Sequence, residues 1–332
     1  MIDFVSKRYV YFTISLLVML PGLISIILPG GLETGIEFSS GSNFSVRFQE
    51  DLTSGQVRAA LGELGHPESR IQQTGEDRFM VRTSLIEGAA ESPPFGPAPP
   101  SEREDIEAGL VERFGPLLDS EGNVSDRFIE FSSVSASVSS DITRNAAIAV
   151  VVAAVAVLIF VTFSFWNVPS PVRYGAATVL ALAHDVVIVL GVASILGRII
   201  DFEVDSLFIT AMLTIIGFSV HDTIVVFDRI RENVLRAELA GYRVPLAQAV
   251  NASLNQTLAR SLNTTITLFL AILALLLLGG GTIQDFLITM LIGLISGTYS
   301  SVFIAAQLLV SWEEGDLPGF SAGAHEEAEV AA

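Results

Sequence analysis

Six long apolar windows, separated by polar segments, dominate the pattern along the chain. Each is close to the ~20 residues that an α-helix needs to cross ~30 Å of hydrocarbon. The first is long enough to span, and no small-residue cleavage site follows it, so we expect a retained helix and not a signal peptide. The predicted spans are 9–29, 145–166, 174–197, 206–227, 261–281 and 286–311.

The polar region 30–144, between the first two windows, switches between strand and helix patterns. Two segments, 53–65 and 101–115, open with Thr or Ser and end in Gly, as capped helices do. Alternating apolar and polar residues predict strands at 42–49, 69–74, 77–84 and 126–136. The order β-α-β-β-α-β, with a Pro-rich loop at 87–100, predicts a ferredoxin-like α+β domain. We expect it to bind or to act as a spacer, without catalysis.

Composition supports an α-helical membrane protein and narrows its function. The chain has 332 residues, is 51% hydrophobic and has a mean hydropathy of +0.58, which is too apolar for an ordinary soluble domain. A net charge of −18 argues against nucleic acid as a partner. The absence of cysteine excludes disulfides and thiolate chemistry. The sequence contains no phosphate loop, metal cluster or catalytic triad, so we expect no enzyme activity, no cofactor and no metal.

Arginine and lysine in the short loops set the orientation. Lys7 and Arg8 precede the first span, Arg173 follows the second, and the segment after the fourth is also basic. The loops on the other side are acidic or lack basic residues. Both termini are therefore expected inside. The predicted parts are a cytoplasmic start and first span at 1–29, an outer domain at 30–144, a five-helix bundle at 145–311 and a disordered cytoplasmic tail at 312–332.

The cytoplasmic segment about 229–260 has an amphipathic pattern. Pro245 suits the first turn of a helix, and apolar residues from Leu246 to Leu258 recur on one face. We expect this helix to lie on the inner membrane surface or under the bundle.

Few ionisable residues lie inside the predicted spans, where such residues usually face a bundle interior or a water-filled path. His184 and Asp185 lie about 15 Å from the inner end of the third span, at ~1.5 Å per residue. His221 and Asp222 lie about 9 Å from the inner end of the fourth span by the same rise. Arg260 begins the fifth span at a depth comparable with that of Asp222, so the two can pair if these spans adjoin.

These five residues are candidates for proton coupling. Burial favours a neutral carboxylic acid, whereas a neighbouring arginine favours the carboxylate. Such opposing effects let a carboxylate gain and lose a proton, as a proton relay requires. A buried pair that holds helices in register without moving protons is the alternative reading.

Three spans carry residue stripes on single faces. In the fourth, Asp222 lies about 100° round the helix from a stripe formed by Thr210, Thr214, Gly217, His221 and Asp228. In the fifth, one face continues from Arg260 through Asn263, Thr264 and Thr267. In the sixth, a small-residue stripe favours close helix packing and not chemistry; its members are Gly293, Gly297, Ser301 and Ala305.

Four segments together resemble the SecF branch of the SecD/SecF family, bacterial membrane subunits of protein export. They are ALAHDVVIVLG in the third span, GFSVHDTIVVFDRIREN in the fourth, TLARSLNTTITL in the fifth and GTYSSVFIAA in the sixth. The long domain after the first span matches as well. The combination is far more specific than any single motif, and the resemblance covers most of the chain.

The resemblance implies a fold shared with the resistance-nodulation-division transporters and a place in the bacterial inner membrane. It implies partnership with SecD and with the SecYEG channel. The implied activity is to use the proton-motive force to help an unfolded preprotein leave that channel. By motif, Asp222 and Arg260 match the intramembrane residues of the family that take part in proton movement, and His184 and Asp185 match a family motif too.

Three positions depart from the usual family pattern. Glu37 stands where Asp is usual, Ser40 where Gly is usual, and His221 where Asn commonly precedes the Asp of the fourth span. His221 either relays protons or donates a hydrogen bond. Two other functions stay open, an exporter of small molecules or lipids from the same superfamily and a purely structural subunit. Against the exporter, six spans and one outer domain are only half of such a pump.

Overall fold

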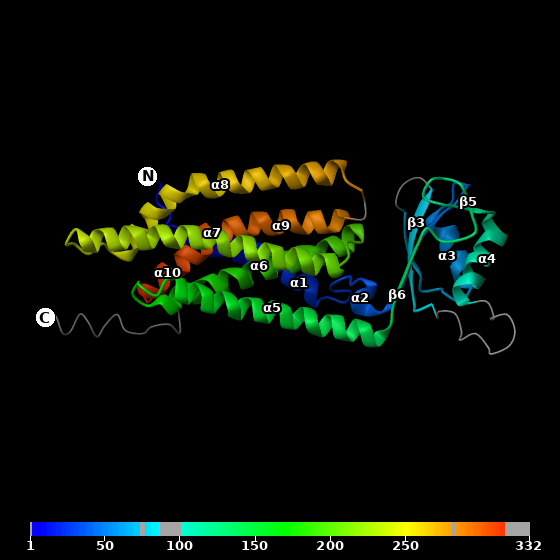
Figure 1. The fold of residues 1–332 in the computed structure, drawn as a ribbon, viewed down its shortest axis with the longest axis horizontal. Coiled ribbons are helices and arrows are strands. Elements are labelled where there is room, and N and C mark those ends of the chain that lie inside the picture. The colour runs from blue at the N-terminus through cyan, green and yellow to red at the C-terminus, as the bar shows by residue number, and fades with distance from the viewer. Residues whose placement is uncertain (1, 74–76, 87–100, 281–282, 316–332) are drawn as a thin grey trace. The chain divides into compact units, whose positions relative to one another are not determined.

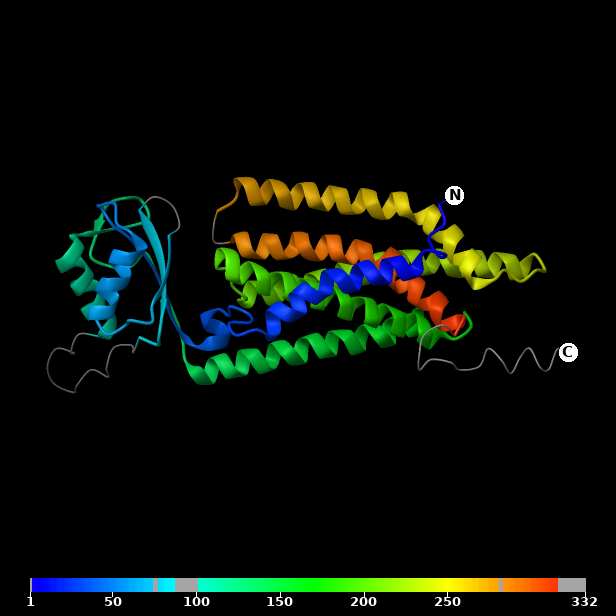
Figure 2. The same cartoon turned by 180° about the vertical axis from the view of Figure 1, so that it is seen from behind.

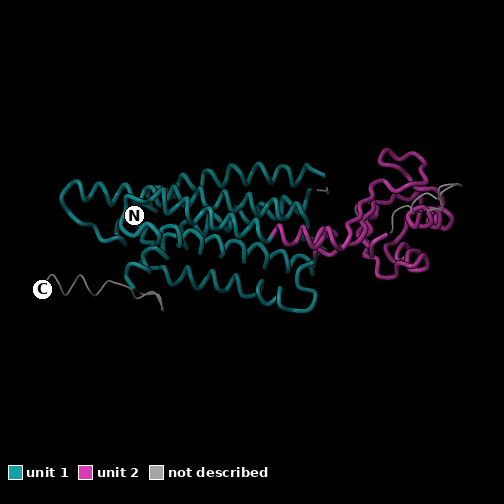
Figure 3. Tube along the Cα trace, turned by 60° about the horizontal axis from the view of Figure 1, so that its bottom comes forward, with its two compact units in different colours: residues 1–33, 147–332 teal, residues 34–146 magenta. Residues whose placement is uncertain are grey.

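The computed structural model describes residues 2–73, 77–86, 101–280 and 283–315. The chain divides into two compact units, which Figure 3 colours separately. A helical unit comprises Met1–Glu33 and Ala147–Ala332, and a smaller unit comprises Thr34–Ala146. The expected Pro-rich loop at 87–100 and most of the expected tail lie outside the described residues.

Within the described part of the chain, six helical segments are long and apolar enough to cross a membrane, which confirms the six predicted spans (Figures 1 and 2). The first five are α1 (Arg8–Ile27), α5 (Ala136–Ser164), α6 (Pro171–Ile200), α7 (Ser206–Leu239) and α8 (Leu246–Leu278). The sixth consists of α9 (Gln284–Ser300), a π-helix η2 (Ser301–Ala305) and α10 (Ala306–Glu313).

The predicted amphipathic segment is not a separate element. α7 runs on to Leu239, and α8 begins at Leu246, directly after its N-cap Pro245. The segment therefore forms the ends of two long helices, because its backbone continues the helix beyond the apolar window. Its apolar face is buried as expected, with Val250 and Leu254 both 0% exposed.

The predicted start of the disordered tail, at 312, is also too early. α10 continues to Glu313, and its end is held by ion pairs. Glu314 bonds Arg8 at 2.6 Å, and Glu313 bonds Arg173. These pairs attach the end of the sixth span to the first turns of α1 and α6.

α1 packs against α6 through two glycines. A Cβ built at Gly22 lies 2.6 Å from the Cα of Gly191, and one built at Gly191 lies 2.8 Å from the Cα of Gly22. The two backbones therefore touch, as small residues allow between membrane helices. Beyond this crossing, the Arg198 guanidinium donates to the carbonyls of Ser25 (2.9 Å) and Leu28 (3.2 Å), which satisfies free carbonyls at the end of α1.

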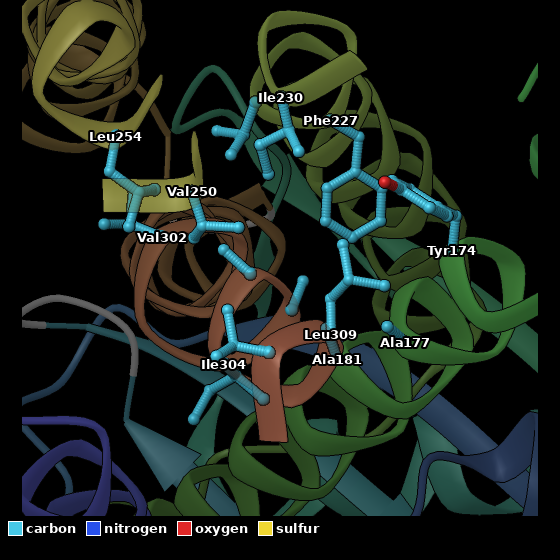
Figure 4. Close-up of a cluster of buried hydrophobic side chains, with 14 of the residues drawn as sticks. Tyr174, Ala177, Ala181, Phe227, Ile230, Val250, Leu254, Val302, Ile304 and Leu309 are labelled. Atoms are coloured by element: carbon cyan, nitrogen blue, oxygen red, sulfur yellow. The ribbon is translucent and has the colours of Figure 1, made fainter. Parts of the chain in front are cut away.

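The apolar core of the helical unit lies where α5, α6, α7, α8 and the sixth span meet (Figure 4). The Phe227 ring on α7, 0% exposed, packs edge-on against Tyr174 of α6, with ring centroids 5.2 Å apart. It packs in the same way against Phe165, just after α5, at 6.0 Å. Only 6% of the most apolar window of α5 is buried, so this aromatic contact is a main attachment of α5.

The smaller unit is a four-stranded antiparallel sheet in the order β2-β3-β1-β6 with two helices, which confirms the ferredoxin-like α+β domain. Thr53 and Ser101 form capping boxes at the two predicted helix starts. The elements are β1 (Gly41–Arg47), α3 (Ser54–Glu63), β2 (Arg70–Gln73), β3 (Arg78–Thr83), α4 (Glu102–Phe114) and β6 (Glu130–Val134). Three short elements were not expected, α2 (Ile36–Ser39), β4 (Leu117–Leu118) and β5 (Val124–Ser125).

Ser40 has φ 62° and ψ 163°. This region is essentially restricted to glycine and costs a side chain roughly 1–3 kcal/mol. Ser40→Gly is therefore expected to stabilise the smaller unit by about 1 kcal/mol. The hydrogen exchange of the β1 amides in the full chain should slow by about fivefold, and this slowing measures the gain in stability. Ser39→Gly, one residue earlier in α2, is the control and is expected to speed this exchange.

Candidate functional site

Asp185 is a buried carboxylate at the meeting point of α6, α7 and α9. It is 2% exposed and accepts hydrogen bonds from Ser219 of α7 at 2.7 Å, and from Ser296 and Ser300 of α9 at 2.6 and 2.7 Å. His184 Nδ1 lies 3.2 Å from its Oδ1. Hydroxyl donors from two helices thus replace the water that a carboxylate would otherwise require.

Asp222 is a second buried carboxylate, 6% exposed, on α7. It accepts hydrogen bonds from Ser261 of α8 at 2.7 Å and from Ser301 of η2 at 2.5 Å. Over the described ranges, Asp222 forms no ion pair with a basic side chain. Ionisable residues within membrane spans are rare and usually functional, which makes Asp222 a candidate site residue.

Neighbouring residues of the sixth span hold the two carboxylates. Ser300 is the last residue of α9 and Ser301 the first of η2. Because successive helical residues point about 100° apart, one hydroxyl reaches Asp185 on α6 and the other reaches Asp222 on α7. π-helical turns occur frequently at functional sites. We call this group the carboxylate centre, and it comprises Asp185, Asp222, Ser219, Ser261, Ser296, Ser300 and Ser301.

Arg260 does not belong to the carboxylate centre, which corrects its expected ion pair with Asp222. α7 and α8 do adjoin, as expected. However, Ser261 faces inward, and the preceding residue of the helix therefore faces outward, so Arg260 is exposed. His221 is exposed for the same reason, because Asp222 beside it faces inward. His184 stays with Asp185, and among the described residues its Nε2 atom has no hydrogen-bond partner.

Polar residues of α7 and α8 are also exposed on the single chain, and we call them together the outward polar surface. Both predicted polar stripes contribute to it, because each occupies an outward face of its helix. Polar groups seldom face lipid, so such a surface in a membrane indicates contact with another protein or with water. Its residues are Thr210, Thr214, Gly217 and His221 on α7 and Arg260, Asn263, Thr264 and Thr267 on α8.

Sequence reasoning missed the five serines of the carboxylate centre and assigned the small-residue stripe of the sixth span to packing alone. Packing is present: a Cβ at Gly297 would lie 3.1 Å from Ser219 Cβ, and Gly293 lies against Ile215. Ser301, in the same stripe, also donates a hydrogen bond to Asp222, so packing is not its only contact. The available signal was a pair of serines one turn apart, Ser296 and Ser300, inside an apolar span.

Comparison with known proteins places the chain in a family. The model of the family described as "Protein export membrane protein SecD/SecF, C-terminal" matches residues 117–315. The protein translocase subunit SecF of Thermobaculum terrenum is 41% identical over 316 residues, which are 95% of this chain and 95% of that protein. The chain belongs to the SecF family. The family resemblance of the four membrane motifs is thereby confirmed.

Longer SecF relatives carry additional sequence. The protein translocase subunit SecDF of Thermus thermophilus is 34% identical over 308 residues, 91% of this chain but 37% of that protein. A crystal structure of SecDF from Thermus thermophilus, described as a translocon-associated membrane protein, superposes with a TM-score of 0.74 at 32% identity. The match covers 94% of this SecF chain and 39% of that chain, so the SecF fold recurs within a larger protein.

Proposed function

We propose that this SecF-family chain is an accessory, non-catalytic subunit of the Sec protein-export machinery, which uses the proton-motive force to help preproteins cross the bacterial cytoplasmic membrane. One observation carries the coupling to protons. Asp222 is buried within the spans and is held by the hydroxyl groups of Ser261 and Ser301, with no basic partner in the described structure. The SecF and SecDF names of the relatives support the export role.

The carboxylate centre offers a chemical basis for two states. Ser301 Oγ lies 2.5 Å from Asp222 and 3.1 Å from the Thr298 carbonyl, so its single proton can be donated to either acceptor. Ser300 has the same choice between Asp185 at 2.7 Å and the Gly297 carbonyl at 3.2 Å. A proton on Asp222 removes the charge that attracts the hydroxyl groups. Protonation therefore weakens the hold of α8 and η2 on α7, which biases a conformational equilibrium.

SecD is the proposed partner at the outward polar surface. SecDF relatives, in which SecF-like sequence is part of a longer chain, support a close association. Arg260, His221 and the threonines beside them would then face a protein and not lipid, which avoids their cost in hydrocarbon. The description of the SecDF crystal structure as translocon-associated supports a place next to the SecYEG channel. We propose that both termini lie inside and the ferredoxin-like domain outside.

Proton coupling is tested with Asp222→Asn in inner-membrane vesicles that contain SecD and SecYEG. We expect the gradient-dependent part of preprotein export to fall to the level without this subunit, because the amide cannot exchange a proton. Arg260→Ala is expected to lower export to the same level, because Arg260 lies on the outward polar surface that we propose contacts SecD. Asp228→Asn is the matched control, since Asp228 is exposed on the same helix, just after the predicted fourth span, and pairs with Arg231. Its export should equal that of the parent.

The competing functions give different results. If Asp222→Asn and Arg260→Ala both assemble with SecD and export at the parent rate, the subunit is a structural stabiliser. Transport of a small molecule or lipid by the purified chain would instead support the exporter. The SecF-family match over nearly the whole chain favours protein export.

A further inference from the structure

The segment before α1 is held against α8 by two asparagine side chains. The Ile2 amide donates to Asn255 Oδ1, and Asn255 Nδ2 donates back to the Ile2 carbonyl, both at 2.8 Å. The Phe4 amide donates to Asn251 Oδ1, also at 2.8 Å. Residues 2–4 belong to no helix or strand, so these side chains provide their backbone with hydrogen bonds. Figure 2 shows the N-terminus beside the first turns of α8.

Apolar burial holds the same segment against the sixth span. Phe4 and Val5 are 4% and 6% exposed and belong to the core cluster that contains Val250 and Leu254 of α8. The Phe4 ring packs on Phe303 of η2, with centroids 6.0 Å apart. The segment 2–5 therefore contacts both α8 and η2.

These two elements supply the two hydroxyl donors of Asp222. Ser261 follows the asparagines on α8, and Ser301 precedes Phe303 on η2. The same part of α8 is also held by burial of Val250 and Leu254 and by the hydrogen bond from Asn233 of α7 to Ser253. Because the segment 2–5 contacts both α8 and η2, it contributes to the spacing of Ser261 and Ser301 around the carboxylate.

We propose that the segment 2–5 is a strap and that Asn251 and Asn255 are positioning residues for Asp222. With the strap seated, α8 and η2 keep both hydroxyl groups on the carboxylate and close it to the inner side. With the strap released, α8 moves away from η2, and Asp222 exchanges its proton with inner water. This inference rests on the proposed function, in which Asp222 carries a proton.

The ionisable groups around Asp222 are compatible with a strap that acts by position and not by charge. On α7 the neighbour is His221, which is exposed. On α8 it is Arg260, which is also exposed. On α6, His184 and Asp185 are linked to this region through Ser300, one residue from Ser301, and through Ser219 on α7. The strap itself holds its place through backbone amides and the buried Phe4 and Val5.

Thiol labelling tests the strap, because the parent chain contains no cysteine. Thr257→Cys, 7% exposed between Asn255 and Ser261, reports on the inner part of α8. In inverted vesicles with SecD, we expect a charged, impermeant maleimide to label it slowly. Asn251→Leu with Asn255→Leu removes all three side-chain hydrogen bonds to the segment 2–5 and should speed the labelling at least about tenfold. The single variant Asn251→Asp keeps an acceptor for the Phe4 amide and leaves Asn255 unchanged. Its labelling should therefore be slow, in contrast to that of the double leucine variant.

Two controls separate strap release from general loosening. Gln248→Leu removes an exposed amide from the same helix and should leave the labelling of Thr257→Cys slow. Ser311→Cys, 0% exposed on α10 near the proposed inner end, should stay slow in the double asparagine variant. Equal acceleration at Ser311→Cys and Thr257→Cys, or no acceleration at either, overturns the strap.

A proton leak distinguishes failure of the strap from failure of the proposed function. The double asparagine variant should dissipate an imposed proton gradient faster than the parent, as followed by a pH-sensitive dye. Adding Asp222→Asn should abolish this leak. Faster labelling without a leak would mean that the strap opens the centre but that Asp222 carries no protons, which overturns the proposed function. A leak that persists with Asp222→Asn overturns the positioning role of the strap.

Discussion

Gly191→Ala is expected to destabilise the helical unit by about 3 kcal/mol, because the added methyl group meets backbone and not a flexible side chain. It would lie 2.8 Å from the Cα of Gly22, which is closer than nonbonded carbon atoms approach. α1 would have to move away from α6. That movement also strains the bonds from Arg198 to the end of α1. Unfolding of the purified chain in mild detergent measures the loss.

Gly217→Ala is the matched control for this prediction. Gly217 also lies inside a membrane-spanning helix, but a Cβ added there meets nothing within 4 Å. Its substitution should be neutral or stabilising by up to ~1 kcal/mol, since alanine is the better helix former. Equal stabilities of the two variants would show that α1 and α6 can separate without cost, and that the glycine contact does not fix α1.

Phe227→Ala is expected to cost the helical unit about 3–4 kcal/mol. The ring is fully buried against Tyr174 (Figure 4) and against Phe165, and its removal leaves a cavity that these rings line. Because α5 buries so little surface elsewhere, the loss should appear first as loosening of α5. Proteolysis of the segment between α5 and α6, measured with the unfolding midpoint, should increase.

Phe163→Ala provides the comparison for the aromatic core. Phe163 is in the last turns of α5, close to Phe165 in sequence, but it is 77% exposed. Surface substitutions usually change stability by no more than about 0.5 kcal/mol, and we expect that limit to hold here. If Phe163→Ala destabilised the chain as much as Phe227→Ala, the attachment of α5 would depend on its outer face and not on this aromatic contact.

The sequence predicts the membrane spans and the ferredoxin-like order well, because hydrophobic length and capping are local properties. Thr53 and Ser101 start helices where their capping boxes indicate. The short hairpin Leu117–Leu118 with Val124–Ser125 has too few residues for a periodic pattern. The π-helix at Ser301–Ala305 was not predicted either, because its residues are as apolar and small as those of an ordinary membrane helix.

The carboxylates of the site were predicted, but most of their partners were not. Charged residues inside spans attract attention because charge is costly there. Serine gives no such signal, since its hydroxyl can bond a carbonyl of its own helix, as Ser253 does to Ala249. The Arg260 pairing failed for another reason. The prediction compared only the depths of Asp222 and Arg260 along their spans. The direction of a side chain around the helix decides whether it faces inward, and on α8 the inward direction is that of Ser261.

The π-turn divides the sixth span into two parts, α9 and α10, and the rotation of each part about the helix axis is fixed by different contacts. One additional residue in a helix turns everything after it by about 100°. Gly293 and Gly297 fix the part before the turn against α7, while Glu313 and Glu314 fix the part after it through their ion pairs. Removing one residue from Ser301–Ala305 would therefore turn α10 by about 100° about the helix axis. The length of this segment thus sets the angle between the carboxylate centre and the C-terminal end of the sixth span.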